Sequence, residues 1–145
     1  MKFEDFYKNR KILITGHTGF IGSWLKKWLT MLDVKVCGYA LDPPTQPNLY
    51  EVLNLTRKVS KDIRGDIRDT ELLRETILDF QPEVVFHLAG KLIVLKSYDN
   101  PSETFDTNVI GTVNLLNELR KVDSVKAIVI VTSDKSYRNK EWVYP

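Results

Sequence analysis

The sequence has 145 residues, of which 43% are hydrophobic and 28% charged, so it supports one hydrophobic core and is too short for two full domains. Its formal net charge is only +2 and its basic residues are scattered among acidic ones, which excludes the basic stripe that a nucleic-acid backbone requires. A single cysteine excludes an internal disulfide, and no apolar run approaches the roughly 20 residues of a membrane span, so we expect a cytoplasmic protein without nucleic-acid or membrane partners.

The first part of the chain alternates short apolar runs with helical periodicity. Residues 11–15, KILIT, form the first predicted strand, and residues 34–41 form the second, with Cys37 as a buried, reduced thiol. Between them, helical spacing predicts a helix whose apolar side faces the core. The residues of that side are Phe20, Ile21, Trp24, Leu25, Trp28, Leu29 and Leu32.

The alternation continues to the end of the chain. A brief strand is predicted near residues 62–63, a helix then begins at Asp69 or Thr70 and ends before Pro82, and residues 83–90 form a continuous apolar strand. A long helix over residues 100–122 begins with a capping pattern and precedes a fifth strand at 127–132. The apolar stripe predicted to face the core from this helix comprises Phe105, Val109, Val113, Leu116 and Leu119.

Strands that alternate with helices across short loops predict an α/β fold with parallel pairing and right-handed crossovers. The simplest arrangement is a doubly wound parallel sheet of the Rossmann type, with five strands in the order 3-2-1-4-5. We therefore expect residues 1–145 to form one such domain.

Three glycines, Gly16, Gly19 and Gly22, stand at three-residue intervals between the first strand and the first helix. Glycines also make plain turns, but in this context they predict a tight turn, a close approach of backbone to phosphate, and close packing of helix on sheet. The helix N-terminus then faces an anion, which we interpret as a dinucleotide diphosphate. We expect the cofactor to contact Gly16, Thr18, Gly19, Phe20, Ile21 and Gly22.

Two acidic residues follow later predicted strands. Asp42 ends the second strand, where a carboxylate accepts hydrogen bonds from ribose hydroxyls and repels a 2′-phosphate, so NAD is favoured over NADP. The alternative is a turn-forming aspartate before Pro43. Asp66, followed by Ile67, is placed to face the adenine amino group, and its alternative is a helix cap or a solvated acid.

These motifs occur in an order that resembles the extended short-chain dehydrogenase/reductase superfamily. More narrowly, GHTGFIGSWL, GYALDPPTQPNLYEV, SYDNPSETFDTNVIGTVNLL and VTSDKSYRNKEWV resemble the CDP-glucose 4,6-dehydratase family, and the likeness spans essentially the whole chain. The run Ser-Asp-Lys stands where the related dTDP-glucose enzymes have Thr-Asp-Glu. The resemblance implies NAD as cofactor and CDP-glucose as substrate, with transient oxidation at C4, loss of water across C5 and C6, and return of the hydride to C6.

The resemblance also assigns roles to residues. Ser133 would hydrogen-bond the C4 oxygen, Asp134 would protonate the departing C6 hydroxyl, and Lys135 would act where the C5 base does. Asn108 matches a structural asparagine that bonds backbone near the active site. Further cofactor contacts are implied for Leu88, Ala89, Gly90 and Thr132. His17 and His87 are interpreted as structural, and no metal site is expected.

Two departures limit what the resemblance implies. Relatives commonly read Ala-Ala-Gln-Pro where this chain has Ala89-Gly90-Lys91-Leu92, which puts an ammonium near the nicotinamide side. The chain also stops at Pro145, ahead of the family's Tyr-x-x-x-Lys helix and substrate-binding lobe, so we expect these 145 residues alone to be nearly inactive.

Other readings of the function remain open. One alternative hypothesis is a non-catalytic NAD-binding or interaction module. Another is part of a nucleotide-sugar epimerase, which the Ser-Asp-Lys run disfavours because it does not match the usual epimerase residues. The missing helix would leave apolar surface uncovered, so we expect a homo-oligomer.

Overall fold

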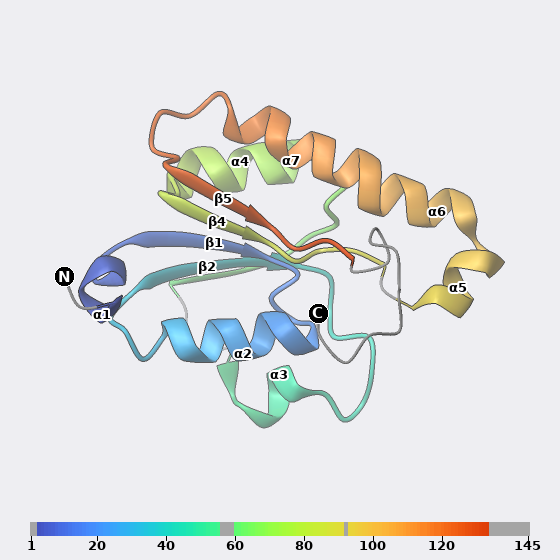
Figure 1. The fold of residues 1–145 in the computed structure, drawn as a ribbon, viewed down its shortest axis with the longest axis horizontal. Coiled ribbons are helices and arrows are strands. Elements are labelled where there is room, and N and C mark those ends of the chain that lie inside the picture. Colours follow the sequence, from blue (N-terminus) through green and yellow to red (C-terminus); the bar gives the residue numbers. More distant parts are fainter. Residues whose placement is uncertain (1–2, 56–59, 92, 134–145) are drawn as a thin grey trace, which may run out of the picture.

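The computed structural model describes residues 3–55, 60–91 and 93–133. One five-stranded parallel sheet has the order β3-β2-β1-β4-β5, which confirms the predicted doubly wound α/β fold (Figure 1). The strands are β1 (Lys11–Thr15), β2 (Lys35–Ala40), β3 (Lys61–Arg64), β4 (Val84–His87) and β5 (Ala127–Ile130). The helical elements are α1 (Phe3–Tyr7), α2 (Phe20–Leu29), α3 (Leu49–Val52), α4 (Thr70–Phe80), α5 (Val94–Asp99), α6 (Pro101–Phe105), the π-helical turn η2 (Asp106–Ile110) and α7 (Gly111–Leu119).

The sheet lies between two helical layers, with α2 and α3 on one face and α4 and α7 on the other (Figure 1). Alternate strand residues fill the two cores because successive side chains point to opposite faces. The core against α4 and α7 contains Leu13, Cys37, Tyr39, Val85, Leu73, Ile77, Leu115 and Leu119. The core against α2 contains Ile12, Ile14, Val36, Val84 and Leu29. Burial of both faces accounts for the continuous apolar runs of the central strands.

The prediction for the buried side of α2 is wrong for its larger residues. Phe20, Ile21, Trp24 and Trp28 are between 40% and 70% exposed, whereas the helix buries Gly22, Ser23, Lys26 and Leu29. Two close contacts set this rotation: Gly22 lies directly against the backbone of Gly16, and Lys26 lies 3.6 Å from a partly buried acid of the sheet, Asp62. Apolar spacing alone did not reveal that a glycine and a lysine face inward.

The predicted long helix is formed, but its buried side also differs from the prediction. It runs as α6, the π-helical turn η2 and α7, and Phe105, Val109 and Val113 are at least 48% exposed. The buried positions recur every four residues at Thr107, Gly111, Leu115 and Leu119. A Cβ on Gly111 would lie 2.5 Å from Ile67 Cγ2, so this glycine allows the close approach that fixes the helix rotation.

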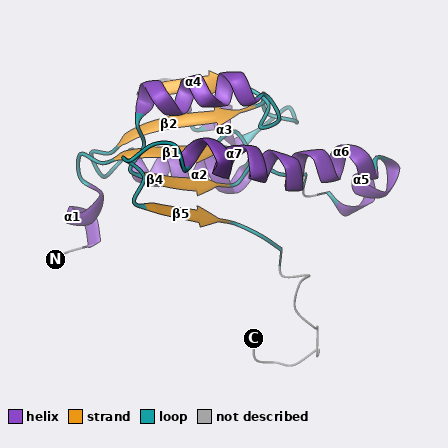
Figure 2. Cartoon of the chain, turned by 90° about the horizontal axis from the view of Figure 1, so that it is seen from above, coloured by secondary structure: helices purple, strands orange, loops and turns teal. Residues whose placement is uncertain are grey.

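The predicted helix starts are confirmed. Asn100 Oδ1 accepts from the Glu103 N–H at 3.2 Å, with Pro101 as the first helical residue, and Asp69 Oδ1 accepts from the Leu72 N–H at 3.1 Å. Strand β5 lies at one edge of the sheet (Figure 2). All four of its residues are exposed. Within the described residues, no helix is both long and apolar enough to cross a membrane.

Candidate functional site

The turn after β1 brings the backbones of two loops into contact. Gly16 has φ of +73°, and its N–H donates to the Tyr39 carbonyl at 2.9 Å. A Cβ on Gly16 would lie 2.7 Å from the Ala89 nitrogen, and a Cβ on Gly22 would lie 2.2 Å from the Gly16 oxygen. Gly16 and Gly22 therefore make room for the protein's own backbone.

Gly19 has a different environment. Among the described residues, a Cβ there would meet only the Gly16 oxygen, at 3.4 Å, and Gly19 lines an open cavity. It is the N-cap of α2, where no side chain caps the helix and the first turn carries no acidic residue. The first N–H groups of a helix lack intrahelical acceptors and favour negative charge. The turn thus offers bare backbone and a helix N-terminus to an anion such as a diphosphate.

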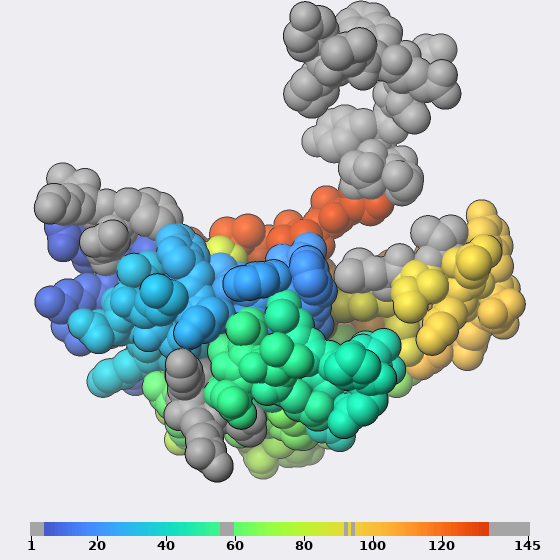
Figure 3. Space-filling view, turned by 90° about the horizontal axis from the view of Figure 1, so that it is seen from below, coloured from blue at the N-terminus to red at the C-terminus, as the bar shows by residue number. Residues whose placement is uncertain are grey.

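The cavity has a volume of about 420 Å³ and follows the carboxyl ends of β1, β2, β3 and β4. Figure 3 shows the molecule hollowed between the start of α2, in blue, and α5, in yellow. Ten residues predicted to bind cofactor line it: Gly16, Thr18, Gly19, Phe20, Asp42, Asp66, Ile67, Leu88, Ala89 and Gly90. The structure therefore brings together predicted residues from four separate loops.

Other predicted residues lie outside this cavity. Gly22 is buried beneath Gly16, Ile21 is 54% exposed, and Asn108 bonds to the backbone of Lys91. Thr132 and Ser133 follow β5 and are exposed. The remaining predicted catalytic residues, Asp134 and Lys135, lie outside the described residues.

The sequence did not identify the residues that complete the wall. Tyr39, Gly65 and Arg68 lie in or after the carboxyl ends of two predicted strands, and proximity to a strand end is the sequence signal that could have identified them. Others come from α5 to η2, and only the tertiary fold places them. They are Ile93, Lys96, Ser97, Glu103, Thr104 and Thr107. Thr107 Oγ1 is buried and has no hydrogen-bond partner among the described residues, so the cavity wall has a polar group to offer a bound molecule.

The carboxylate of Asp42 stands at the cavity beside a cation. Its side chain is 85% exposed, and Oδ1 lies 3.1 Å from Arg64 Nε. The Thr18 hydroxyl donates to the Leu41 carbonyl at 2.9 Å, which joins the glycine turn to the loop that carries Asp42. The predicted ribose-binding acid is therefore exposed at the cavity, with one of its oxygens already paired.

Asp66 is bound by Arg68 rather than by the helix terminus. Its Oδ1 accepts from the Arg68 backbone N–H and from Nε, both at 2.9 Å, and its Oδ2 accepts from Nη2 at 2.6 Å. These hydrogen bonds lower the pKa of the Asp66 carboxyl. The Tyr39 hydroxyl donates to the Asp66 carbonyl at 2.8 Å and fixes the loop from the other side. Asp69, not Asp66, is the cap of α4.

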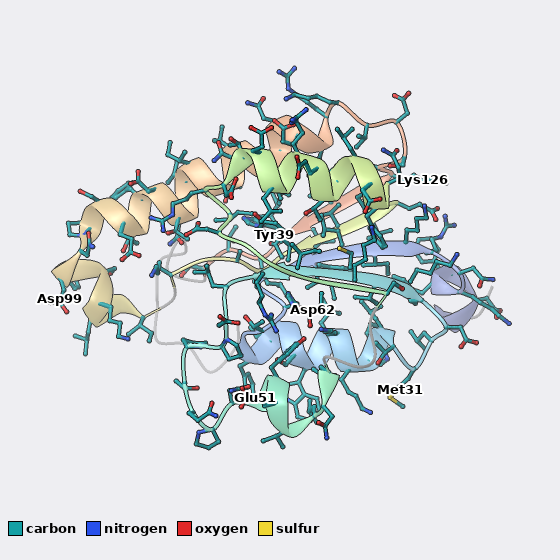
Figure 4. All side chains as sticks on the ribbon, turned by 180° about the vertical axis from the view of Figure 1, so that it is seen from behind. Met31, Tyr39, Glu51, Asp62, Asp99 and Lys126 are labelled. Carbon is teal, nitrogen blue, oxygen red and sulfur yellow. The ribbon has the colours of Figure 1, made fainter. Side chains whose placement is uncertain are left out.

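His17 belongs to a buried polar cluster between the sheet and α2. Its Nε2 lies 2.9 Å from Asp62 Oδ1, and Asp62 also accepts from Tyr50 and lies 3.6 Å from Lys26 Nζ. Asp62 lies on the α2 side of the sheet, and Tyr39 lies on the α4 side (Figure 4). Burial lowers the pKa of His17 to about 4 and that of Lys26 to about 8. His17 is therefore neutral, and donates to Asp62.

His87 links the sheet to α7. The Thr112 hydroxyl donates to the Asn108 carbonyl at 2.7 Å, so it accepts from His87 Nε2 at 2.9 Å, and His87 Nδ1 then accepts from the Thr15 hydroxyl at 2.6 Å. Burial lowers the pKa of His87 and favours this neutral form. Among the described residues, no group of three or more His, Cys, Asp or Glu side chains is placed to hold a metal ion.

A parallel sheet of order 3-2-1-4-5, with a glycine turn that opens on a cavity at the strand ends, defines the class of Rossmann-type dinucleotide-binding domains. Within that class, the model of the GDP-mannose 4,6 dehydratase family matches residues 13–140. The chain belongs to this family.

Individual relatives agree with this assignment. CDP-glucose 4,6-dehydratase of Salmonella typhimurium is 50% identical over 141 residues, which are 97% of this chain and 39% of the relative. CDP-paratose 2-epimerase of Salmonella typhi is 33% identical over 90% of this chain and 39% of its own length. The crystal structure of UDP-glucose 4-epimerase from Brucella ovis in complex with NAD has a TM-score of 0.73 at 27% identity, over 88% of this chain and 37% of that one. The chain thus spans about two fifths of the relatives it matches.

Proposed function

We propose that this chain is the NAD-binding portion of a nucleotide-sugar 4,6-dehydratase that acts on CDP-glucose. The observation that carries the proposal is the bare backbone at Gly19, which opens the N-terminus of α2 to a cavity large enough for part of a dinucleotide. The 50% identity to a CDP-glucose 4,6-dehydratase supports the choice of substrate.

Different residues of the cavity wall suit different parts of the dinucleotide. The N–H groups at the start of α2 donate hydrogen bonds to the diphosphate, because this turn leaves them without a capping side chain. Asp42 accepts hydrogen bonds from the adenosine ribose hydroxyls through the oxygen that Arg64 does not engage. Asp66, Ile67 and the segment from Leu88 to Gly90 line the same cavity. In this proposal the first two contact the adenine, and the segment leads toward the nicotinamide.

The catalytic residues proposed for the reaction follow the last strand. Ser133 lies three residues beyond the end of β5, at the carboxyl edge of the sheet where doubly wound domains bind ligands. In this proposal Ser133 holds the C4 oxygen of the sugar, Asp134 gives a proton to the C6 hydroxyl and Lys135 takes the C5 proton. Bound NAD supplies a hydride acceptor at C4 and a hydride donor at C6. A base at Lys135 requires an ammonium pKa lowered by its surroundings.

NAD titration of the 145-residue chain by isothermal calorimetry tests the binding step. We expect saturable binding by the parent chain and its loss in Gly19→Val, whose side chain enters the cavity. Gly19 has φ of −72° and ψ of 173°, a conformation open to valine, so the variant keeps the thermal unfolding midpoint of the parent. Absence of binding by the folded parent at millimolar NAD would overturn the proposal.

A second measurement addresses turnover. We propose that the 145-residue chain has almost no activity alone, because its one Tyr-x-x-x-Lys spacing, Tyr7 to Lys11, joins α1 to the start of β1 and does not line the cavity. Without a positioned proton relay the deficit is about 10²-fold to 10⁴-fold or more. Incubation with NAD and CDP-glucose should give no detectable 4-keto-6-deoxy product, while a longer chain that includes the family's Tyr-x-x-x-Lys helix restores it. Turnover at an ordinary enzyme rate by the short chain would show that the relay is dispensable.

A further inference from the structure

We propose that Arg64 is a cofactor-selectivity residue: a fixed cation that Asp42 covers, and that becomes a receptor for the 2′-phosphate of NADP when the Asp42 carboxylate is removed. The proposal rests on the proposed function, because it assumes that the cavity binds the adenosine half of NAD. Arg64 would bind a 2′-phosphate, a role that neither the glycine turn nor the Asp42 carboxylate performs.

The position of the two side chains supports this role. Asp42 lines the cavity and Arg64 does not, although Arg64 Nε lies only 3.1 Å from Asp42 Oδ1. The carboxylate therefore stands between the cavity and the guanidinium. A 2′-phosphate at the ribose that Asp42 serves would meet a negative charge first, with a positive charge directly behind it.

Arg64 is held in place by contacts that do not involve Asp42. Its Nη1 lies 3.3 Å from Asp62 Oδ1, and its guanidinium lies over the Tyr50 ring at 5.0 Å from the centroid. Asp62 is itself fixed by His17 Nε2 at 2.9 Å and by the Tyr50 hydroxyl. Removal of the Asp42 carboxylate should leave the guanidinium where it is, with Nε unpaired and facing the cavity.

The charged side chains around Arg64 sum to no net charge, so the preference between NAD and NADP depends on the Asp42–Arg64 pair itself. Asp42 and Asp62 oppose Arg64 and Lys26, and His17 is neutral because burial lowers its pKa to about 4. A 2′-phosphate, which carries about −1.5 to −2 charges near neutral pH, more than replaces the single negative charge of Asp42, whereas a neutral side chain at position 42 leaves one excess positive charge. A guanidinium also binds phosphate through two parallel N–H groups, which an ammonium does not.

The experiment compares the affinities of NAD and NADP by isothermal calorimetry in four forms of the chain: the parent, Asp42→Ala, Arg64→Gln and the double variant. We expect the parent to favour NAD. Asp42→Ala should bind NADP about 10-fold to 100-fold more tightly than the parent does, the worth of a charge-assisted hydrogen bond, and this gain should decline as salt is raised. The double variant should lose the gain. Arg74→Gln, which alters an exposed pair on α4, is the matched control and should change neither affinity.

Each other outcome is decisive. A gain of NADP binding that survives in the double variant means that removal of Asp42 alone is responsible, and overturns the role of Arg64. No gain in Asp42→Ala overturns it as well. If the folded parent binds neither nucleotide, the proposed function fails and this inference fails with it, whereas NAD binding without the predicted coupling rejects only the inference. Should Arg64→Gln lower the unfolding midpoint, Arg64→Lys replaces it, because it keeps an ion pair with Asp62 but lacks the fork, and it should lose most of the gain.

Discussion

The side-chain amide of Asn108 forms hydrogen bonds with both the N–H and the carbonyl of Lys91. Asn108 Oδ1 accepts from the Lys91 N–H at 2.7 Å, and its Nδ2 donates to the Lys91 carbonyl at 3.2 Å. Asn108 lies in the π-helical turn η2, and Lys91 belongs to the cavity wall after β4. The widened turn places the amide opposite the loop, so a local irregularity of one helix sets the position of a segment 17 residues earlier in the chain.

We predict that Asn108→Ala loosens this loop. Two hydrogen bonds are lost, and because the site is exposed, water replaces part of their value, so the free energy of unfolding should fall by about 1–2 kcal/mol. Hydrogen exchange at the Gly90 and Lys91 amides should accelerate beyond this global change. Asn117→Ala is the control, since the one side-chain hydrogen bond of Asn117 within the described residues comes from Arg120, the C-cap of α7, and the variant should cost less than about 0.5 kcal/mol. Equal effects of the two variants would remove the special role of Asn108.

How far the sequence predicted the fold depends on the kind of signal. The order of elements along the chain followed from continuous apolar runs and caps, which are local, and the strand order followed from the right-handed crossovers of a doubly wound parallel sheet. The rotations of α2 and α7 did not, because they are set by Gly22 against Gly16 and by Gly111 against Ile67, contacts between distant segments. Apolar periodicity was right for Leu29 and Leu119, which are buried, and for Leu25, which packs against the core, but it also selected aromatic and β-branched residues that are exposed. The helices α1, α3 and α5 were not predicted, because each is at most six residues long and has no full helical period to read.

The same distinction holds in the candidate site. The glycine spacing identified the residues that touch the cavity at Gly16 and Gly19, and the strand ends identified Asp42 and Asp66. The buried cluster behind Asp42 was not foreseen, because its members come from β3, α2 and α3, and a lone lysine or tyrosine in a sequence gives no sign of burial. Lys26 is fully buried because Asp62 and Tyr50 satisfy its ammonium group.

Alanine substitutions at Gly22 and at Gly19 should differ in their effect on the free energy of unfolding. We predict that Gly22→Ala lowers the free energy of unfolding by about 3 kcal/mol or prevents folding, because its Cβ would lie 2.2 Å from backbone that cannot move aside. Gly19→Ala should change stability by less than about 1 kcal/mol, since its Cβ would meet one atom at 3.4 Å. Urea denaturation of the two variants measures the contrast. Similar stabilities would show that the turn has more room at Gly22 than the contacts indicate.

We propose that the chain self-associates through the exposed side of the helix formed by α6, η2 and α7, and through strand β5. Phe105 of α6, Val109 of η2 and Val113 of α7 are exposed apolar residues of this helix, and β5 is an edge strand with exposed side chains. Sedimentation velocity at micromolar concentration should show an oligomer in the parent chain. Val113→Glu should shift it toward monomer, whereas Met31→Glu, at a 70% exposed position beyond α2, should not. A monodisperse parent monomer would contradict the prediction.

Cys37 should be unreactive until the protein unfolds. The thiol is fully buried on β2, and burial raises its pKa to about 12, so almost no thiolate is present near neutral pH. We expect no labelling by an aromatic disulfide reagent in buffer and one thiol per chain in denaturant. Rapid labelling of the folded chain at pH 7 would show that β2 opens locally.

The final prediction concerns acid stability and His17. Burial lowers its pKa in the folded chain to about 4 from an ordinary 6.5, while Asp62 opposes this shift and Lys26 and Arg64 support it. The unfolded chain therefore takes up a proton first, and the stability that neutral His17 contributes is present above pH 6.5 and lost as the pH falls to about 4. A shift of this size corresponds to about 3 kcal/mol.

The measurement is the free energy of unfolding at pH 7.5, 6.5, 5.5 and 4.5 for the parent and for His17→Gln, whose amide remains neutral and can donate to Asp62. The difference between the two proteins cancels His87, whose pKa is also lowered by burial. The parent should lose stability more steeply than the variant between pH 6.5 and 4.5, and the two curves should run parallel above pH 7. Parallel curves throughout would mean that His17 titrates normally in the folded chain, and that the cluster around Asp62 admits water.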